Sequence, residues 1–230
     1  MFSKNELEVM TNAFEKMDEM YRYQRYFYDF TRKYYLIGRD RLISSMKILD
    51  GERVLEIGCG TGRNLLILAK KFPNTKFFGL DASSEMLKTA ELQSSKNINF
   101  ARALADNFDY RQTFDLENPF DTIFFSYSLS MIDNWRQAID YALKNLKDDG
   151  SFYIVDFYDQ KDLPKFFSQP LKRWLKLFHV RYKPELLAYL EELEAKKIGK
   201  LEITPLARRY AYIVKFQKTL RPTTEILTES

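Results

Sequence analysis

Residues 54–62 read VLEIGCGTG, a largely apolar start followed by glycines at alternate positions. The apolar start predicts a buried strand, and the glycines let the backbone turn sharply and approach a ligand closely. Arg63–Phe72 (RNLLILAKKF) then predicts a helix, which Pro73 ends. A strand, a glycine loop and a helix in this order predict a ligand site at the carboxyl edge of a parallel sheet.

Two acidic residues narrow the kind of ligand. The loop reads G-x-G-x-G rather than the dinucleotide pattern G-x-G-x-x-G, and Glu56 lies in the strand just before it. A pyrophosphate would be repelled by this carboxylate, whereas a cationic or amine-bearing ligand would be attracted. Asp81 ends the next predicted strand, where an acid in open α/β sites accepts hydrogen bonds from ribose hydroxyls. The alternative is that Asp81 only caps the following helix together with Ser83.

The rest of the chain alternates between short apolar runs and helix-like segments. Predicted strands lie at 53–58, 76–81, 97–103, 120–126 and 151–157, and predicted helices at 63–72, 83–93 and 134–146. This alternation predicts an α/β fold, a doubly wound, mostly parallel sheet with helices on both faces. A helix at 184–198 and a strand at 208–218 follow.

We expect a single domain over residues 1–230, because neither a linker nor an internal repeat is visible. Its expected parts are a helical N-terminal lid (1–50), a cofactor-binding core (51–157), a basic aromatic insertion (158–183), and a C-terminal helix and strands (184–220).

Composition excludes several classes of protein. One cysteine and one histidine in 230 residues allow no intrachain disulfide and disfavour a zinc site, so we expect no metal. Neither a secretory signal nor an 18-residue apolar run is present, which predicts a cytoplasmic protein with at most peripheral contact at the inner face of the membrane. The net charge of +4 and the aromatic content of 16% fit nucleic acid, a membrane surface or a packed core equally well.

VLEIGCGTGRN followed by FFGLDASSEML resembles the first two motifs of the class I S-adenosylmethionine-dependent methyltransferases. The resemblance implies S-adenosylmethionine as cofactor, S-adenosylhomocysteine as product, and a seven-stranded, Rossmann-like sheet whose last strand, 208–218, is antiparallel. It implies a cofactor site lined by Glu56, Gly58, Cys59, Gly60, Asn64, Asp81, Ala82, Ser83 and Met86.

The chain departs from that family after the third strand. Many members carry Gly-Asp-Ala there, with the aspartate facing the adenine, but this sequence places Leu104 at the acidic position. The resemblance leaves Asp106 and the backbone of Ala105 as the adenine contacts.

The fourth predicted strand ends in Ser126 and Tyr127, which we expect to face the site. The alternative is that Tyr127, Leu129 and Met131 pack beneath the next helix. Tyr127 therefore enters both as a cofactor contact and as a candidate catalytic residue.

The phrases YDFTRKYYLIGRDRLI and SYSLSMI are similar to segments of the N-methyltransferases that make betaine lipids from diacylglyceryl-homoserine. The similarity implies that Tyr28 faces the sulfonium as a second catalytic candidate, and that Arg32 or Arg39 pairs with a carboxylate. The alternative for the arginines is a solvated helix face.

Residues 161–183 combine basic and aromatic side chains. Leu171, Trp174, Leu175 and Phe178 recur at helical spacing with basic residues between them. Such a helix suits either an anionic membrane interface or packing against the domain.

Together these patterns predict an N-methyltransferase that acts on the amine of a homoserine-type lipid head group. The alternatives are a methyltransferase of another small amine or of RNA, and a cofactor-binding module without turnover. We expect no nucleic-acid partner, because the fourth strand lacks the Asn/Asp-Pro-Pro-Tyr type of motif. The number of methyl groups added, a general base and the oligomeric state stay open.

Overall fold

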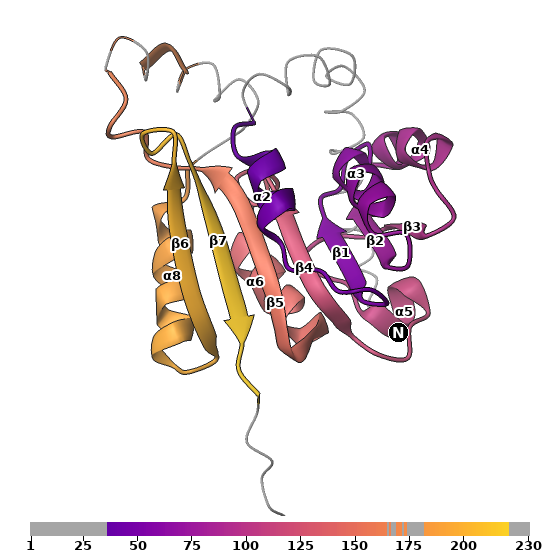
Figure 1. The fold of residues 1–230 in the computed structure, drawn as a ribbon. Helices are drawn as coiled ribbons and strands as arrows, with labels where there is room; N and C mark the ends of the chain where they lie inside the picture. Colours follow the sequence, from indigo (N-terminus) through magenta and orange to yellow (C-terminus); the bar gives the residue numbers. More distant parts are fainter. Residues whose placement is uncertain (1–35, 165, 167–168, 172, 174–181, 221–230) are drawn as a thin grey trace, which may run out of the picture.

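The computed structural model describes residues 36–164, 166, 169–171, 173 and 182–220. Within these residues seven strands form one sheet in the order β3-β2-β1-β4-β5-β7-β6 (Figure 1). Strands β1 to β5 pair in parallel, and β7 is antiparallel to both β5 and β6. The predicted α/β fold with a seven-stranded, mostly parallel sheet is confirmed.

The strands are β1 (Arg53–Ile57), β2 (Lys76–Asp81), β3 (Ile98–Arg102), β4 (Phe120–Ser126), β5 (Leu146–Phe157), β6 (Gly199–Leu206) and β7 (Ala211–Lys218). The helices are α2 (Arg39–Ser45), α3 (Arg63–Lys71), α4 (Ser84–Leu92), α5 (Tyr110–Phe114), α6 (Trp135–Asn145) and α8 (Pro184–Ala195).

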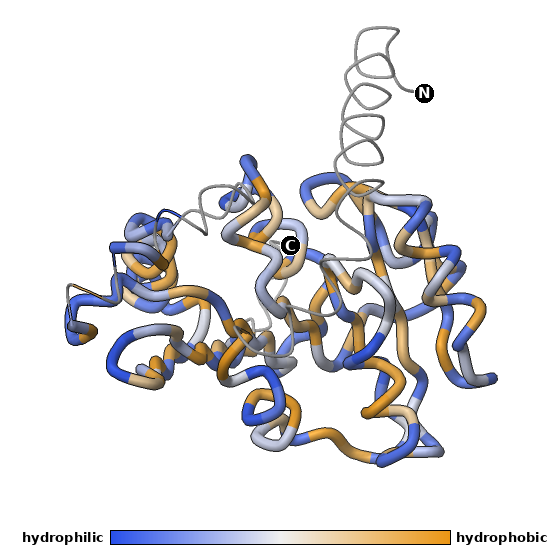
Figure 2. Tube along the Cα trace, turned by 90° about the horizontal axis from the view of Figure 1, so that it is seen from above, coloured by the Kyte–Doolittle hydropathy of each residue, from blue (hydrophilic) through white to orange (hydrophobic). Residues whose placement is uncertain are grey.

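Helices cover both faces of the sheet. Helices α2, α3 and α4 lie on one face, and α5, α6 and α8 lie on the other (Figure 1). Except for the short α5, each helix buries side chains three or four residues apart, such as Leu65 and Leu68 in α3, or Ile139 and Ala142 in α6. Apolar and hydrophilic residues accordingly alternate along the elements in Figure 2. The central strands are therefore buried between two apolar layers.

The strand order reverses beside β1. The chain runs from β1 outward through β2 to β3, and then returns to place β4 on the other side of β1. Ile57 near the end of β1 lies beside Phe125 near the end of β4. In an open α/β sheet this reversal leaves a crevice outside the carboxyl ends of the two strands, where ligands bind.

Two C-terminal boundaries differ from the prediction. The helix predicted at 184–198 ends at Ala195, and the strand predicted at 208–218 begins at Ala211, after a turn. Strand β6 had no separate range in the prediction. It forms one edge of the sheet, and its exposed Lys200 and Glu202 weaken the apolar signal.

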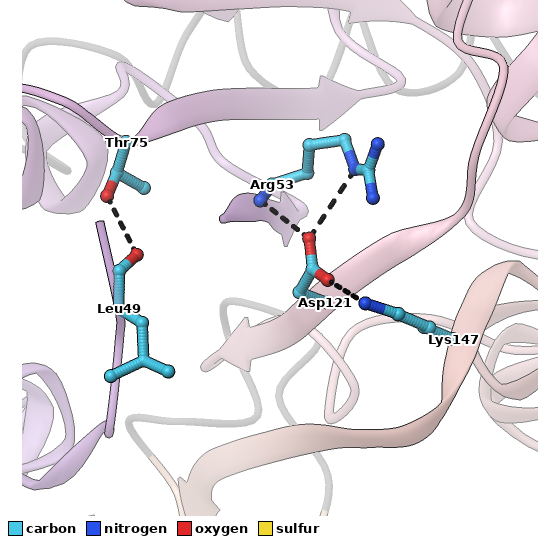
Figure 3. A network of polar contacts seen from close by, with 5 residues as sticks. All are labelled: Leu49, Arg53, Thr75, Asp121 and Lys147. Atoms are coloured by element: carbon cyan, nitrogen blue, oxygen red, sulfur yellow. Dashed lines mark hydrogen bonds and ion pairs between the residues drawn. The ribbon is translucent and has the colours of Figure 1, made fainter. Parts of the chain in front are cut away.

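The opposite, amino edge of the sheet is held by a polar network (Figure 3). The Asp121 carboxylate on β4 accepts a hydrogen bond of 2.9 Å from the Arg53 backbone N–H of β1. The same carboxylate forms ion pairs with Arg53 Nε at 3.4 Å and with Lys147 Nζ of β5 at 3.0 Å. These contacts join three strands at the edge away from the glycine loop.

Most of the predicted N-terminal lid and part of the predicted insertion lie outside the described residues. Of residues 1–50, the structure describes Leu36 onward, including α2, which packs on the sheet. In the insertion, Leu163 and Leu171 pack against the core, whereas Phe166 is 83% exposed. The part of the insertion helix from 174 to 181 is not described. No helix among the described residues is long and apolar enough to cross a bilayer.

Candidate functional site

The glycine loop after β1 uses backbone that only glycine adopts easily. Gly58, Gly60 and Gly62 have φ angles of 73°, 55° and 75°, in the left-handed region. The loop is held to β2, because the N–H groups of Gly58 and Cys59 both donate to the Leu80 carbonyl, at 2.7 and 3.1 Å. A Cβ on Gly58 would lie 2.5 Å from the Cβ of Ser128. Side chains are therefore excluded where the loop meets the end of β4.

Asp81 fastens this loop to the end of β2. Its Oδ2 accepts a hydrogen bond from the Gly60 N–H at 2.8 Å, and its Oδ1 accepts one from the Ser83 N–H at 2.9 Å. Asp81 is only 6% exposed. The carboxylate thus lies between the glycine loop and the entry to α4, as its sequence position predicted.

Glu56 is the second acid beside the loop, and the fold buries it. Its side chain is 1% exposed, and its Oε1 accepts a hydrogen bond from Asn64 Nδ2 at 2.6 Å. Asn64 lies in the first turn of α3, two residues after Gly62. The structure therefore brings together two residues that were each predicted to line the site, and their hydrogen bond joins β1 to the helix that follows the loop.

Several residues predicted to contact adenine lie around the ends of β2 and β3. Ser83 is the N-cap of α4 and its Oγ accepts from the Met86 N–H at 3.4 Å, so the serine caps the helix while Asp81 holds the loop. Ala82 and Ala105 are partly buried. Asp106 Oδ2 accepts a hydrogen bond from Asn134 Nδ2 at 2.7 Å. The adenine contacts themselves stay a prediction.

Ser126 ends β4 beside the loop. Its side chain is 5% exposed, and its Oγ has no hydrogen-bond partner among the described residues. A buried hydroxyl without a partner is unfavourable unless a ligand supplies one. This agrees with the predicted place of Ser126 in a ligand site.

Tyr127 follows in left-handed backbone, with a φ of 57°. Its ring is 3% exposed and packs edge-on against Phe157, with the centroids 4.7 Å apart. Its hydroxyl donates a hydrogen bond to the Ile37 carbonyl. The side chain thus anchors the segment that precedes α2 to the carboxyl edge of the sheet. It packs in the core on the α2 face and not beneath the next helix, α6, as the alternative interpretation expected.

Electrostatics keep the Tyr127 hydroxyl protonated. Burial raises the pKa of Tyr127 well above its ordinary value; Asp156 and Tyr210 raise it further, whereas the Arg39 cation lowers it. A neutral, buried phenol is a hydrogen-bond donor and not a base. A role of Tyr127 in positioning is therefore favoured over proton abstraction. Arg39 itself is 9% exposed at the start of α2.

The structure also brings in residues that the sequence did not single out. Asp156 is the last residue but one of the predicted fifth strand and is 2% exposed. Its Oδ2 accepts from the Ser130 N–H and its Oδ1 from the Phe157 N–H, both at 2.8 Å. Ser128 Oγ donates to the Ile57 carbonyl at 2.9 Å. In the sequence, these residues were indicated only by the serines of SYSLS and the aspartate of YIVDF.

Burial gives Asp156 an unusual acidity. Desolvation raises its pKa from 3.8 to about 6, although hydrogen bonds from Phe157 and Ser130 and the Lys183 cation oppose the shift. Because the folded pKa exceeds the unfolded one, the folded state binds the proton more tightly between pH 4 and 6. The contribution of Asp156 to the free energy of unfolding therefore decreases by about 3 kcal/mol as the pH rises through this window.

We expect the pH dependence of the free energy of unfolding, measured in urea from pH 4 to pH 7, to differ between wild type and the variant Asp156→Asn by this contribution. Asp159→Asn is the matched control with the opposite sign, because the Arg209 side chain lowers the pKa of Asp159. The stabilisation from Asp159 is present above its unfolded pKa and is lost as the pH falls. Parallel pH profiles for wild type and Asp156→Asn would contradict the prediction.

Tyr28 and Arg32, the remaining predicted contacts, lie outside the described residues. The described site therefore consists of the glycine loop, Asp81, the Glu56–Asn64 pair, and the ends of β4 and β5.

Comparison with known proteins agrees with this geometry. Residues 48–209 match the family described as "Methyltransferase domain". YcgJ of Bacillus subtilis, described as an uncharacterized methyltransferase, is 29% identical over 182 residues, which is 75% of this chain and 66% of that protein. The match thus spans just under two thirds of the length of this curated relative.

Two solved structures share the fold. A chain in the complex between the Haloferax volcanii Trm112 methyltransferase activator and a methyltransferase has a TM-score of 0.70 and 14% identity, and the match covers 89% of this chain and 98% of that one. Phosphoethanolamine N-methyltransferase 2 of Haemonchus contortus, in complex with phosphomonomethylethanolamine and S-adenosylhomocysteine, has a TM-score of 0.65 and 15% identity, over 80% of this chain and 52% of that one. At these identities the likeness concerns the fold alone.

Proposed function

Because this chain belongs to the methyltransferase domain family, with the class I Rossmann-like fold, we propose that it is an S-adenosylmethionine-dependent N-methyltransferase that acts on the amine of a homoserine-type lipid head group. The observation that carries the proposal is the Asp81 carboxylate, which holds the glycine loop through Gly60 and the start of α4 through Ser83. An acid in this place is suited to the two hydroxyls of a ribose.

The residues around the loop fit the cofactor. Asp81 would hold the ribose, and Glu56 would place negative charge near the cationic methionine end. The glycines would let the backbone approach the ligand, and the free Oγ of Ser126 offers one more polar contact. When bound, S-adenosylmethionine supplies an activated methyl group. The protein then has to hold the acceptor nitrogen in line with it, and such positioning can contribute about 7–11 kcal/mol.

Aromatic side chains support an amine acceptor. The rings of Tyr127, Phe157 and Tyr210 pack in a row at the ends of β4 and β5, with centroid distances of 4.7 and 5.9 Å. Tyr158 adds contacts with Tyr212 at 5.5 Å. Aromatic faces attract methylated ammonium groups, which are the products of N-methylation. The shared fold with an enzyme that methylates a phosphorylated amine is compatible with this choice.

The proposal of a lipid acceptor rests on the betaine-lipid resemblance and on the insertion. Phe166 is 83% exposed, and exposed basic residues such as Lys161 and Arg173 lie nearby in the sequence. An exposed aromatic ring flanked by cations suits an anionic bilayer surface. We therefore propose peripheral membrane contact through 161–183.

The test is incubation with methyl-labelled S-adenosylmethionine and diacylglyceryl-homoserine in anionic vesicles. We expect label in the lipid amine, and none with the variant Asp81→Ala. Free homoserine and RNA are parallel arms. Label in homoserine alone would indicate a small-amine enzyme, and label in RNA would overturn the amine proposal. Binding of S-adenosylhomocysteine without transfer to any acceptor would indicate a module without turnover.

A further inference from the structure

Gln160 lies three residues beyond the end of β5, and two of its features are energetically unfavourable. Its backbone is left-handed, with a φ of 58°, a conformation in which glycine is usually found. Its side chain is 4% exposed, and its Oε1 is buried without a hydrogen-bond partner. A buried oxygen of this kind needs a donor, and in a ligand site the ligand can supply one.

A neighbouring turn holds Gln160 in this conformation. The Gln160 N–H donates to the Arg209 carbonyl at 2.9 Å, and the Tyr158 N–H donates to the Tyr210 carbonyl at 2.9 Å. The Arg209 guanidinium binds both oxygens of Asp159, with Nε 2.8 Å from Oδ1. It also lies 4.1 Å from the centroid of the Tyr158 ring. The segment after β5 is therefore locked to the β6–β7 turn.

That turn is itself strained. Ala207, Arg208 and Arg209 have φ angles of 46°, 53° and 58°, three consecutive residues in the left-handed region. Non-glycine residues adopt this region at a cost that the surrounding structure must offset, and such strain concentrates at functional sites. Two left-handed segments are thus joined where β5 ends and β7 begins.

Gln160 is also linked, through Leu163, to the core cluster that contains the aromatic row. Its carbonyl accepts a hydrogen bond from the Leu163 N–H at 3.2 Å. Leu163 packs against the core cluster that contains Tyr127, Phe157 and Tyr210. Gln160 therefore lies at the carboxyl edge of the sheet, just beyond the end of β5.

We propose that Gln160 Oε1 accepts a hydrogen bond from an N–H of the acceptor amine. This assignment rests on the proposed function. A carbonyl oxygen can only accept, and an unmethylated amine or ammonium offers several N–H donors. Each transfer replaces one N–H bond by an N–C bond and releases one proton to water, so the trimethylated product has no donor left. The product then leaves Gln160 unpaired, which weakens product binding relative to substrate binding.

The experiment compares two ligands in three proteins. Short-chain diacylglyceryl-homoserine and its trimethylated form are titrated by calorimetry into protein saturated with S-adenosylhomocysteine, so that binding is measured without turnover. The proteins are wild type, Gln160→Met, which keeps the volume but removes the amide oxygen, and Gln160→Glu, which keeps an acceptor oxygen. The measured quantity is the dissociation constant of the trimethylated lipid divided by that of the unmethylated lipid. We expect this ratio to fall about 10-fold in Gln160→Met and to be retained in Gln160→Glu.

A structural role would give a different result. If Gln160→Met weakens both ligands equally, or changes neither, the assignment is overturned. If Gln160→Met does not fold, the variant Arg209→Lys is used instead. A lysine cannot make the two-point contact with Asp159, so the segment that holds Gln160 is held less firmly. A reduced ratio is then expected, and an unchanged ratio counts against the assignment. Wild type that binds S-adenosylhomocysteine but neither lipid refutes the proposed acceptor, and the assignment with it. If only the assignment to Gln160 fails, wild type still binds both ligands.

Discussion

Replacement of Asp81 by alanine is expected to lower the affinity for S-adenosylhomocysteine about 100-fold or more, measured by calorimetry. Under the proposed function, Asp81 offers a charged acceptor to the two ribose hydroxyls, and each such hydrogen bond contributes about 1.5–3 kcal/mol. The substitution also removes the contacts with the Gly60 and Ser83 N–H groups, at 2.8 and 2.9 Å, which keep the loop in place.

Asp121→Ala is the matched control for this prediction. Asp121 is also a largely buried acid at a strand end, and it accepts a hydrogen bond from the Arg53 N–H at 2.9 Å (Figure 3). It lies at the amino edge of the sheet, away from the glycine loop. We expect Asp121→Ala to lower the free energy of unfolding while the affinity for S-adenosylhomocysteine stays near the wild-type value. An equal loss of affinity in both variants would mean that Asp81 acts only through stability.

Replacement of Gly58 by alanine is expected to destabilise the protein by about 2–5 kcal/mol in urea unfolding and to abolish cofactor binding. A left-handed φ of 73° costs an alanine about 1–2 kcal/mol. The added Cβ would also lie 2.5 Å from Ser128 Cβ, and such overlap costs about 1–3 kcal/mol. Relief of the overlap requires the loop or the end of β4 to move, which displaces the proposed cofactor contacts.

Gly51→Ala separates strain from overlap. Gly51 has a φ of 85°, but no atom lies within 4 Å of the Cβ position. We expect this variant to lose only about 1–2 kcal/mol and to bind S-adenosylhomocysteine normally. If Gly58→Ala behaves like Gly51→Ala, the close approach between the loop and β4 is not required for binding.

The residues proposed for the cofactor half of the site lie close together in the sequence, unlike those proposed for the acceptor half. Glu56, Gly58, Asp81 and Ser83 lie within 28 residues of one another, and each belongs to a strand, turn or helix start with its own local signal. Their hydrogen bonds follow directly once β1 and β2 pair in parallel. Their roles as cofactor contacts stay predictions, which the experiments above test.

The acceptor half depends on residues that are far apart in the chain. Arg209 reaches Asp159 across 50 residues, and Tyr127 reaches the Ile37 carbonyl across 90. Neither contact has a periodic pattern, and Gln160 carries no motif. The burial of Asp156, which raises its pKa to about 6, likewise results from several elements packing around it.

Local sequence was sufficient for the α/β class and the parallel core, and it predicts where a ligand site would lie. Turn chemistry, periodicity and glycine conformation act over a few residues, so they can be read from the order of residues alone. The edge strand β6, the paired left-handed turns and the buried oxygens at the ends of β4 and β5 required the folded chain. These features arise where distant segments pack together, because burial and hydrogen-bond satisfaction are properties of the whole assembly of strands and helices.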